Sequence, residues 1–152
     1  GRESISMRRN LNIETITKEL VERIANNSEV LEFFKKSETI EEFGIKYFQN
    51  NLVCGYDLSS TGCKDFISVL VDEYEGNRHV TDQSISMTYK VQIIVSHEDK
   101  SLLDRLSMLI GDIVTEAYPN RGGYCNCSTM TDMGNNYARI INFTLFSTRT
   151  DS

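Results

Sequence analysis

Apolar and polar residues alternate almost without interruption between positions 84 and 96. Ile94 is the one extra apolar residue, and the alternating apolar positions are Ile85, Met87, Tyr89, Val91, Ile93 and Val95. Because the side chains of a β-strand point alternately to its two faces, this pattern predicts one half-buried strand of about 40 Å. A domain of this size covers only part of so long a strand. We therefore expect the surplus to project as a ribbon that pairs with another chain.

Helical spacing of apolar residues dominates the N-terminal third. Asn12 is a suitable cap for a helix that ends near Asn27, and its apolar positions are Ile13, Ile16, Leu20 and Ile24. Ser28 and Ser37 are suitable caps for two further helical segments. The second of these has three residues on one helical face: Ile40, Phe43 and Tyr47. Residues 1–53 are therefore expected to be helical.

The rest of the chain predicts four strands and one helix. Residues 64–74 are apolar on both faces, as in a strand covered on each side. The polar stretch 75–84 should join this strand to the long one, 84–96, as the tip of a hairpin. A helix is predicted over residues 101–118, capped by Asp99 or Ser101 and ended by Pro119. The last two strands are predicted over 124–131 and 137–148.

The expected fold class is therefore α+β. N-terminal helices are followed by a ββαββ, mostly antiparallel sheet with one long hairpin and a covering helix. The 152 residues are expected to form a single domain, 1–152, with a helical region over 1–53 and a sheet core over 64–150. Seven aromatic residues are expected in the core: Phe33, Phe34, Phe43, Tyr47, Phe48, Phe143 and Phe146.

Charge and hydropathy narrow the function classes. The chain has 16 basic and 22 acidic residues, a formal net charge of −6, and most of the excess lies after residue 53. Nucleic-acid affinity comes largely from Lys and Arg that release counterions from phosphates, so specific nucleic-acid binding is not expected. No apolar run reaches the roughly 18 residues of a membrane span, and no signal-peptide pattern is present. We expect a cytoplasmic protein that does not bind membranes.

Residues that could support catalysis are few. His79 lies in the polar hairpin tip and His97 directly after the long strand. Neither has a Cys or carboxylate at the spacing of metal ligands or a catalytic triad, so both are expected to be solvated or at an edge. The glycine-containing turns match no phosphate-binding pattern. We expect no enzymatic activity and no cofactor.

The four cysteines leave one alternative open. Cys125 and Cys127 share one face of a predicted strand, while Cys54 and Cys63 flank a loop. Four thiolates can bind zinc, but these spacings lack the CxxC pattern of recognisable zinc sites. A Cys54–Cys63 disulfide would form only in an oxidising compartment. Reduced, metal-free thiols are expected in a cytosolic chain.

The order of these elements resembles the tail terminator, or tail completion, proteins of long-tailed bacteriophages, the lambda-type and siphophage relatives. Four segments account for the resemblance, which covers about residues 64–150: DFISVLVDEY, ISMTYKVQIIVSHED, LLDRLSMLIGDIVTEAY and ARIINFTLFS. The helical N-terminal region departs from the single opening helix of that family. The resemblance implies a ring, usually of six subunits, that caps the tail tube, stops its polymerisation and joins it to the head. It also implies assembly in the host cytoplasm and residence in the virion tail.

The surplus of the long hairpin is the expected contact between subunits. The candidate oligomer contacts lie near its tip: Arg78, His79, Ile85 and Met87. The expected partners are further copies of the chain, the tail tube protein and head-tail connector proteins. Two alternatives remain, namely another head-tail connector or neck assembly protein and a small-ligand-binding α+β domain.

Overall fold

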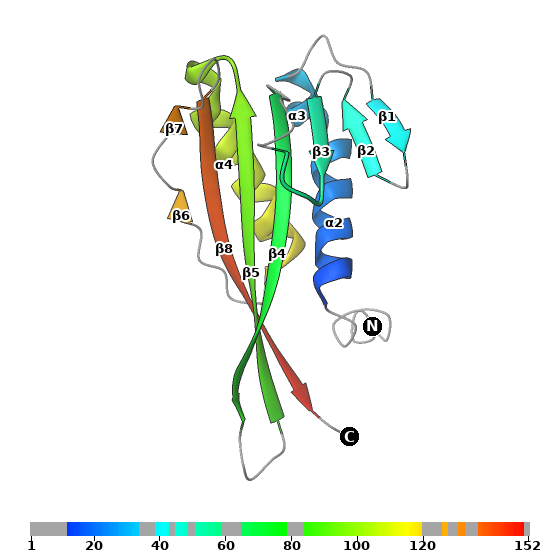
Figure 1. The fold of residues 1–152 in the computed structure, drawn as a ribbon, viewed down its shortest axis with the longest axis vertical. Helices are drawn as coiled ribbons and strands as arrows, with labels where there is room; N and C mark the ends of the chain where they lie inside the picture. Colours follow the sequence, from blue (N-terminus) through cyan, green and yellow to red (C-terminus); the bar gives the residue numbers. More distant parts are fainter. Residues whose placement is uncertain are drawn as a thin grey trace.

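The structure, a computed structural model, describes residues 12–33, 39–42, 45–48, 51–58, 65–78, 84–119, 126–127, 131–132 and 137–150. Its helices are α2 (Ile13–Asn26), α3 (Ser28–Glu32) and α4 (Lys100–Ala117). The strands are β1 (Thr39–Glu42), β2 (Ile45–Phe48), β3 (Asn51–Cys54), β4 (Asp65–Arg78), β5 (Ser84–His97), β6 (Asn126–Cys127), β7 (Thr131–Asp132) and β8 (Tyr137–Thr150). Figure 1 shows helices on one side of a sheet whose three long strands extend past them. The expected α+β class is confirmed.

Asparagines cap both N-terminal helices. The Asn12 Oδ1 atom accepts a hydrogen bond from the Thr15 N–H (2.9 Å), and the Asn12 N–H donates to the Thr15 hydroxyl (3.0 Å), which forms a capping box. Asn27 ends α2 and also caps α3, because its Oδ1 accepts from the N–H of Glu29 and of Val30. The predicted Asn12 cap is thus confirmed. Ser28 is the first residue of α3 and not its cap.

The expected helix after Ser37 is wrong for the residues that the structure describes there. These residues form β1, β2 and β3, and the first two strands pair antiparallel from Thr39↔Phe48 to Glu42↔Ile45. β3 pairs in parallel with β4, from Asn51↔Asp65 to Cys54↔Ser68. This last pairing joins residues distant in sequence, and such contacts override a local helical period. The N-terminal region therefore adds three strands to the sheet.

The long strand predicted over 84–96 is confirmed as β5, which lies between β4 and β8. The sheet formed by the described residues has the order β1-β2-β3-β4-β5-β8-β6, and β7 also pairs with β8. β5 pairs antiparallel with β4, with a register shift between Glu75 and Arg78, and antiparallel with β8 from Ser84↔Thr150 to His97↔Tyr137. Of the predicted third strand, 124–131, residues 126–127 form β6 and residue 131 begins β7, both paired to β8, and the others lie outside the described residues. The expected ββαββ order is therefore only approximate.

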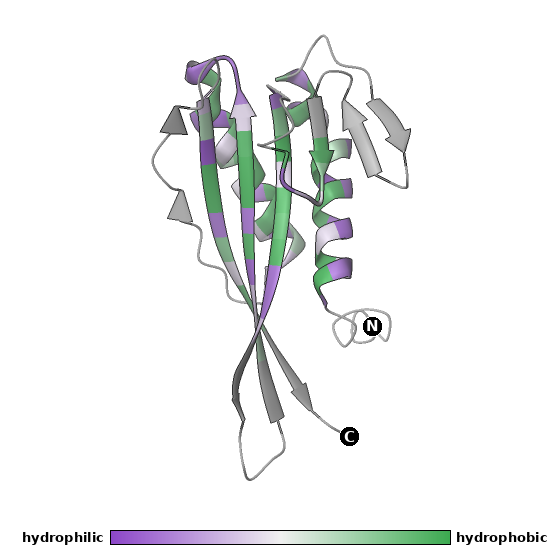
Figure 2. Ribbon diagram, in the orientation of Figure 1, coloured by the Kyte–Doolittle hydropathy of each residue, from purple (hydrophilic) through white to green (hydrophobic). Residues whose placement is uncertain are grey.

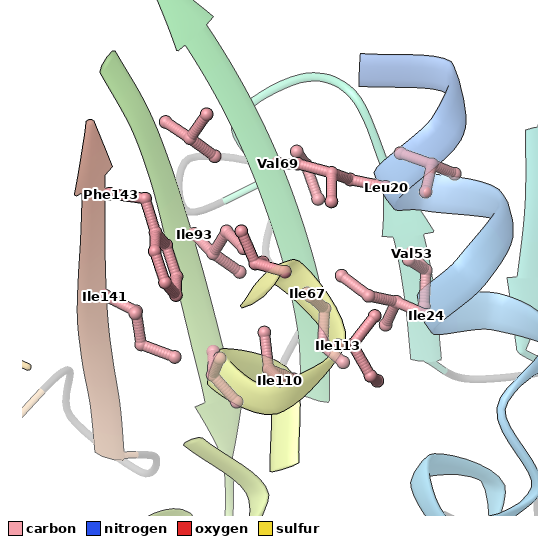
Figure 3. Packing of buried hydrophobic residues seen from close by; sticks show 14 of the residues in the cluster. Leu20, Ile24, Val53, Ile67, Val69, Ile93, Ile110, Ile113, Ile141 and Phe143 are labelled. Atoms are coloured by element: carbon pink, nitrogen blue, oxygen red, sulfur yellow. The ribbon is translucent and has the colours of Figure 1, made fainter. Parts of the chain in front are cut away.

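The main core lies between the helices and one face of the sheet (Figure 3). Figure 3 labels residues from both layers that gather there: Leu20 and Ile24 of α2, Ile110 and Ile113 of α4, Ile67 and Val69 of β4, and Ile93 of β5. Each fully buried Ile or Leu contributes about 1.5–3 kcal/mol. The predicted covering helix 101–118 is confirmed as α4, with Asp99 as its N-cap. Figure 2 shows hydrophobic positions along β4 and β5 beside the helices.

A second, smaller cluster lies on the opposite face of the sheet. It contains Cys54, Leu58, Phe66, Ile94 and Ala138, all buried. The Leu58 N–H donates to the Ser68 hydroxyl over 3.1 Å, which holds the segment after β3 against β4. This cluster explains why Ile94 breaks the alternation of β5. It also confirms that β4 is apolar on both faces because both are covered at this end.

Candidate functional site

The candidate site is the end of the three long strands that begins under the helices and continues past them (Figure 1), which we call the arm. It consists of residues 72–78 of β4, 84–90 of β5 and 144–150 of β8. The sequence predicted a two-stranded hairpin here, but β8 stays paired to β5 as far as Ser84↔Thr150. Three paired strands are more stable than an isolated hairpin. Of the predicted hairpin tip, 75–84, residues 75–78 and 84 belong to strands and the remainder lies outside the described residues.

The two faces of the arm differ. On the helix side, Met87, Tyr89 and Leu145 are buried in the main core. On the open side, Tyr74, Thr88 and Phe146 form one row across the three strands. Tyr74 is 48% and Phe146 is 54% exposed. The open face of the arm thus presents two aromatic rings to solvent.

Lys90 contributes to this open face. Its Nζ atom lies 4.7 Å from the centroid of the Tyr74 ring, a distance suited to a cation–π interaction. Lys90 is itself exposed, and Asp72 lies opposite it on β4. At exposed sites such contacts are worth about 0.5–1 kcal/mol. The contact therefore orients Tyr74 more than it stabilises the fold.

The arm has two edges that lack a strand partner among the residues that the structure describes. β3 pairs with β4 only over Asp65–Ser68, so residues 69–78 of β4 have no described strand paired on that side. β6 and β7 pair with β8 only over residues 137–138 and 141–142, so residues 143–150 are open in the same sense. An open edge presents a row of N–H and C=O groups that can pair with another chain. Within the described part of the chain, both edges of the arm are therefore without a paired strand.

The predicted contact residues fall in different places. Ile85 is paired through its backbone with Arg78 and with Arg149, near the end of the arm. Met87 is only 8% exposed and packs in the main core, so its side chain supports the fold. His79 lies outside the described residues. Contact of these residues with a neighbouring subunit stays a prediction.

Sequence reasoning missed the exposed aromatic row. Phe143 and Phe146 were both expected in the core, and Phe143 is buried at 3% exposure, but Phe146 is exposed. The two residues are an odd number of positions apart, so they point to opposite faces of β8. Strand parity alone could therefore have placed Phe146 on the open face.

His97 was expected to be solvated or at an edge, and its side chain is instead buried. It is 7% exposed, and its Nδ1 accepts a hydrogen bond from the Asp99 N–H over 2.9 Å. In a neutral imidazole the other nitrogen then donates, and the Phe33 carbonyl oxygen lies 3.2 Å from Nε2. His97 thereby joins the end of α3 to the start of α4. Both ring nitrogens are engaged in structural contacts.

Asp99 continues this network as the cap of α4. Its Oδ1 accepts from the Ser101 hydroxyl (2.6 Å) and from the Ser101 N–H (3.0 Å). These two hydrogen bonds hold the pKa of the Asp99 carboxyl below its ordinary value. The carboxylate therefore stabilises the helix start.

Within the described ranges, no group of three or more His, Cys, Asp and Glu side chains is placed to hold a metal ion. Cys54 is buried, and its Sγ donates to the Tyr56 carbonyl oxygen over 3.3 Å. Cys63 and Cys125 lie outside the described residues, as does the side chain of Cys127. None of the helices described is long and apolar enough to cross a membrane.

The chain matches no protein-family model and no curated protein sequence at a significant level.

Proposed function

We propose that this chain is a structural assembly protein of the tail-terminator kind, which associates into a ring that caps a phage or prophage tail tube and joins it to the head. The observation that supports this most is the arm, because its two edges are open among the described residues. An open edge is a site for strand addition by another chain. Compact monomers usually shorten, charge or cover such edges.

The position of the arm on the subunit is also compatible with a ring. Its strands are continuous with the core of the subunit, where Tyr89 and Leu145 are buried. A contact made through the arm is therefore rigidly coupled to the body of each subunit. Rigid contacts that repeat head to tail generate closed rings when the rotation between subunits closes.

The resemblance of residues 64–150 to tail terminator proteins supplies the partners in this proposal. They are the tail tube protein and the head-tail connector proteins, met in the host cytoplasm during assembly and retained in the virion tail. The net charge of −6 supports a ring through which DNA passes without binding, because phosphate contacts need a surplus of Lys and Arg.

The proposal includes no catalytic step. A hydrolase or transferase needs a nucleophile, a base or a metal held together. Among the described residues, His97 is the one histidine, and both of its nitrogens join elements of the fold. Its geometry supports a structural role.

Two measurements test the proposal. Native mass spectrometry of the purified chain should show one closed oligomer, of about six subunits by the resemblance, as the dominant species. Tail tube protein polymerised with the chain should give tubes of fixed length, and over-long tubes without it. A folded chain that stays monomeric and leaves tube length unchanged contradicts the proposal. A ring that binds connector proteins but does not limit tube length would instead indicate a neck protein.

A further inference from the structure

The open face of the arm carries two aromatic rings with a shorter side chain between them. Tyr74 lies on β4 and Phe146 on β8, and Thr88 lies between them on β5. The two outer strands are two strand spacings apart, which is about 10 Å. Both rings are exposed, and Thr88 is partly exposed. A side chain placed over Thr88 by another chain would therefore lie between two aromatic rings.

A methionine suits that position. Its sulfur makes favourable contacts at about 5 Å from an aromatic ring, so a sulfur midway between two rings about 10 Å apart contacts both. Met108 on α4 is 72% exposed, the highest exposure of any large hydrophobic side chain among the described residues. It lies on the side of the helix away from Leu106 and Ile110, which are buried in the main core. A second copy of the chain can thus supply the methionine.

The charged residues beside these two positions are complementary. On the arm, Asp72 and Lys90 lie opposite one another, one row from the rings and about 7 Å from them along the strands. On α4, Asp104 and Arg105 precede Met108 by about one turn, or about 5–6 Å. All four charged side chains are exposed. Lys90 can therefore meet Asp104 when Asp72 meets Arg105.

The two charges of α4 are already oriented within their own subunit. Asp104 pairs with Arg139 of β8 and remains exposed. The Arg105 guanidinium lies 5.8 Å from the centroid of the Phe33 ring. Side chains that are held in place before binding lose less conformational freedom when a partner arrives. Both charges are thus prepared for a contact with a second copy.

The order of the charges sets the orientation of the second copy. Within one subunit α4 runs back along the sheet from the end of β5 (Figure 1). When Met108 lies over Thr88 and the charge pairs meet, α4 of the second copy is antiparallel to β5 of the first in the same way. Turned end for end, α4 would meet the charged row with residues 109–117, which contain no Lys or Arg. The second copy therefore keeps the direction of the first.

The described residues leave room for this contact. It uses a face of the arm, so β3, β6 and β7, which pair at the edges of β4 and β8, do not obstruct it. The second cluster, which includes Leu58, covers the open face at the level of Phe66 and Ile94. The row of Lys90 lies two rows further along β5. The open face is therefore uncovered by described residues where α4 would lie.

We propose that α4 of one subunit lies on the open face of the arm of the next, with Met108 between Tyr74 and Phe146. The inference rests on the self-association in the proposed function and names one surface of that contact. Each subunit contributes its helix side to one neighbour and its open face to the other, so the contact is heterologous. The strands of the arm twist past one another (Figure 1), so each copy is rotated relative to the one before. Such a contact generates a ring when the rotation closes.

Two glutamate variants block the two halves of this contact separately. Tyr74→Glu removes one ring of the arm, and Met108→Glu removes the side chain that would lie between the rings. Each should weaken association about tenfold or more, because a carboxylate then replaces an apolar contact at the centre of the interface. The matched controls are Tyr56→Glu and Ile13→Glu, at exposed residues outside both surfaces. Thermal unfolding checks the fold of each variant, and native mass spectrometry counts the subunits.

A mixture of the two blocked variants distinguishes this contact from others. At a concentration where wild type assembles and each variant alone is monomeric, the mixture should form 1:1 heterodimers and nothing larger, because one intact arm and one intact α4 remain. Full assembly of Met108→Glu alone would indicate a contact through the arms only and would overturn the inference. Full assembly of Tyr74→Glu alone would overturn it as well. In both cases self-association stands, whereas a monomeric wild-type chain overturns the proposed ring too.

A charge exchange tests the same contact if a glutamate variant does not fold. Asp72→Lys should weaken association about two- to fivefold, the range of an exposed charge pair, because the new lysine faces Arg105. Adding Arg105→Glu in the same chain should restore association, since the two charges are then exchanged. If strand edges alone made the contact, this change on α4 would restore nothing, and that outcome overturns the inference. Lys18→Glu, at an exposed residue of α2, is the matched control and should restore nothing.

Discussion

The Nε2 atom of His97 lies 3.2 Å from the carbonyl oxygen of Phe33, although the two residues are 64 positions apart. The contact joins the last residue of β5 to the residue that ends α3. On the other side of the ring, Nδ1 accepts from the Asp99 N–H. A single imidazole thus fixes the position of two helices relative to β5.

Replacing His97 by Ala should therefore destabilise the protein. The Phe33 carbonyl and the Asp99 N–H would lose their partner, and a buried group left without a hydrogen bond costs about 1–3 kcal/mol. Urea unfolding of His97→Ala against wild type measures this change. Glu98→Ala, at the exposed neighbour, should stay within about 0.5 kcal/mol of wild type. Equal stabilities for the two variants would contradict a structural role for the His97 side chain.

Gly55 allows β3 to approach α2. A Cβ atom at this position would lie 2.5 Å from Cγ2 of Thr17. Thr17 cannot rotate freely, because its hydroxyl donates to the Ile13 carbonyl oxygen over 2.7 Å. Gly55→Ala should therefore cost about 1–3 kcal/mol, the usual range for overpacking.

A double variant separates this clash from other effects of the substitution. Thr17→Ser removes only the methyl group that the new Cβ would meet and keeps the hydroxyl. Gly55→Ala should thus be clearly less destabilising in a Thr17→Ser background than in the wild type, as measured by a double-mutant cycle. Equal costs in the two backgrounds would show that Thr17 is not the obstacle.

The cap of α4 should depend on pH. The hydrogen bonds from Ser101 lower the pKa of Asp99 in the folded protein from its ordinary value of 3.8. Its stabilising contribution is therefore complete above pH 3.8 and is lost as the pH falls through the lower, folded-state pKa. Wild type should unfold at a higher temperature than Asp99→Asn at neutral pH, and the difference should shrink as the pH falls through the folded-state pKa of Asp99. A constant difference between the two would argue against the ionised cap.

The local pattern of apolar and polar residues was sufficient to predict some secondary-structure elements and not others. The long strand β5 was predictable because alternation is a local property and nearly every residue of 84–97 obeys it. The strands β1 to β3 were not, since the spacing of Ile40 and Tyr47 also fits a helix and β3 is held by β4. The participation of β8 in the arm could not be predicted either. The pairing of Ser84 with Thr150 depends on how far two segments distant in sequence stay in register.

For the candidate site too, the sequence predicted some features and could not predict others. Projection of the hairpin followed from the length of the strand, and Ile85 and Arg78 do lie near the end of the arm. The burial of Met87 was not foreseen, because the sequence does not reveal how far along β5 the helices reach. The open edges depend on where β3, β6 and β7 stop pairing, and those limits are set by tertiary structure.

The arm finally allows assembly to be separated from folding with two substitutions of the same kind. Met87→Lys places a charge in the main core, where Met87 is 8% exposed, and should unfold the chain or cost several kcal/mol, on the order of 3 or more. Phe146→Lys places the same charge at a residue 54% exposed on the β8 edge and should change stability by about 0.5 kcal/mol or less. A lysine on an edge strand opposes strand addition, so Phe146→Lys should lower the oligomer fraction while the thermal midpoint stays near that of wild type. Size-exclusion chromatography with light scattering, run beside thermal unfolding, measures both quantities. An oligomer fraction unchanged in Phe146→Lys would exclude the β8 edge from the subunit contact.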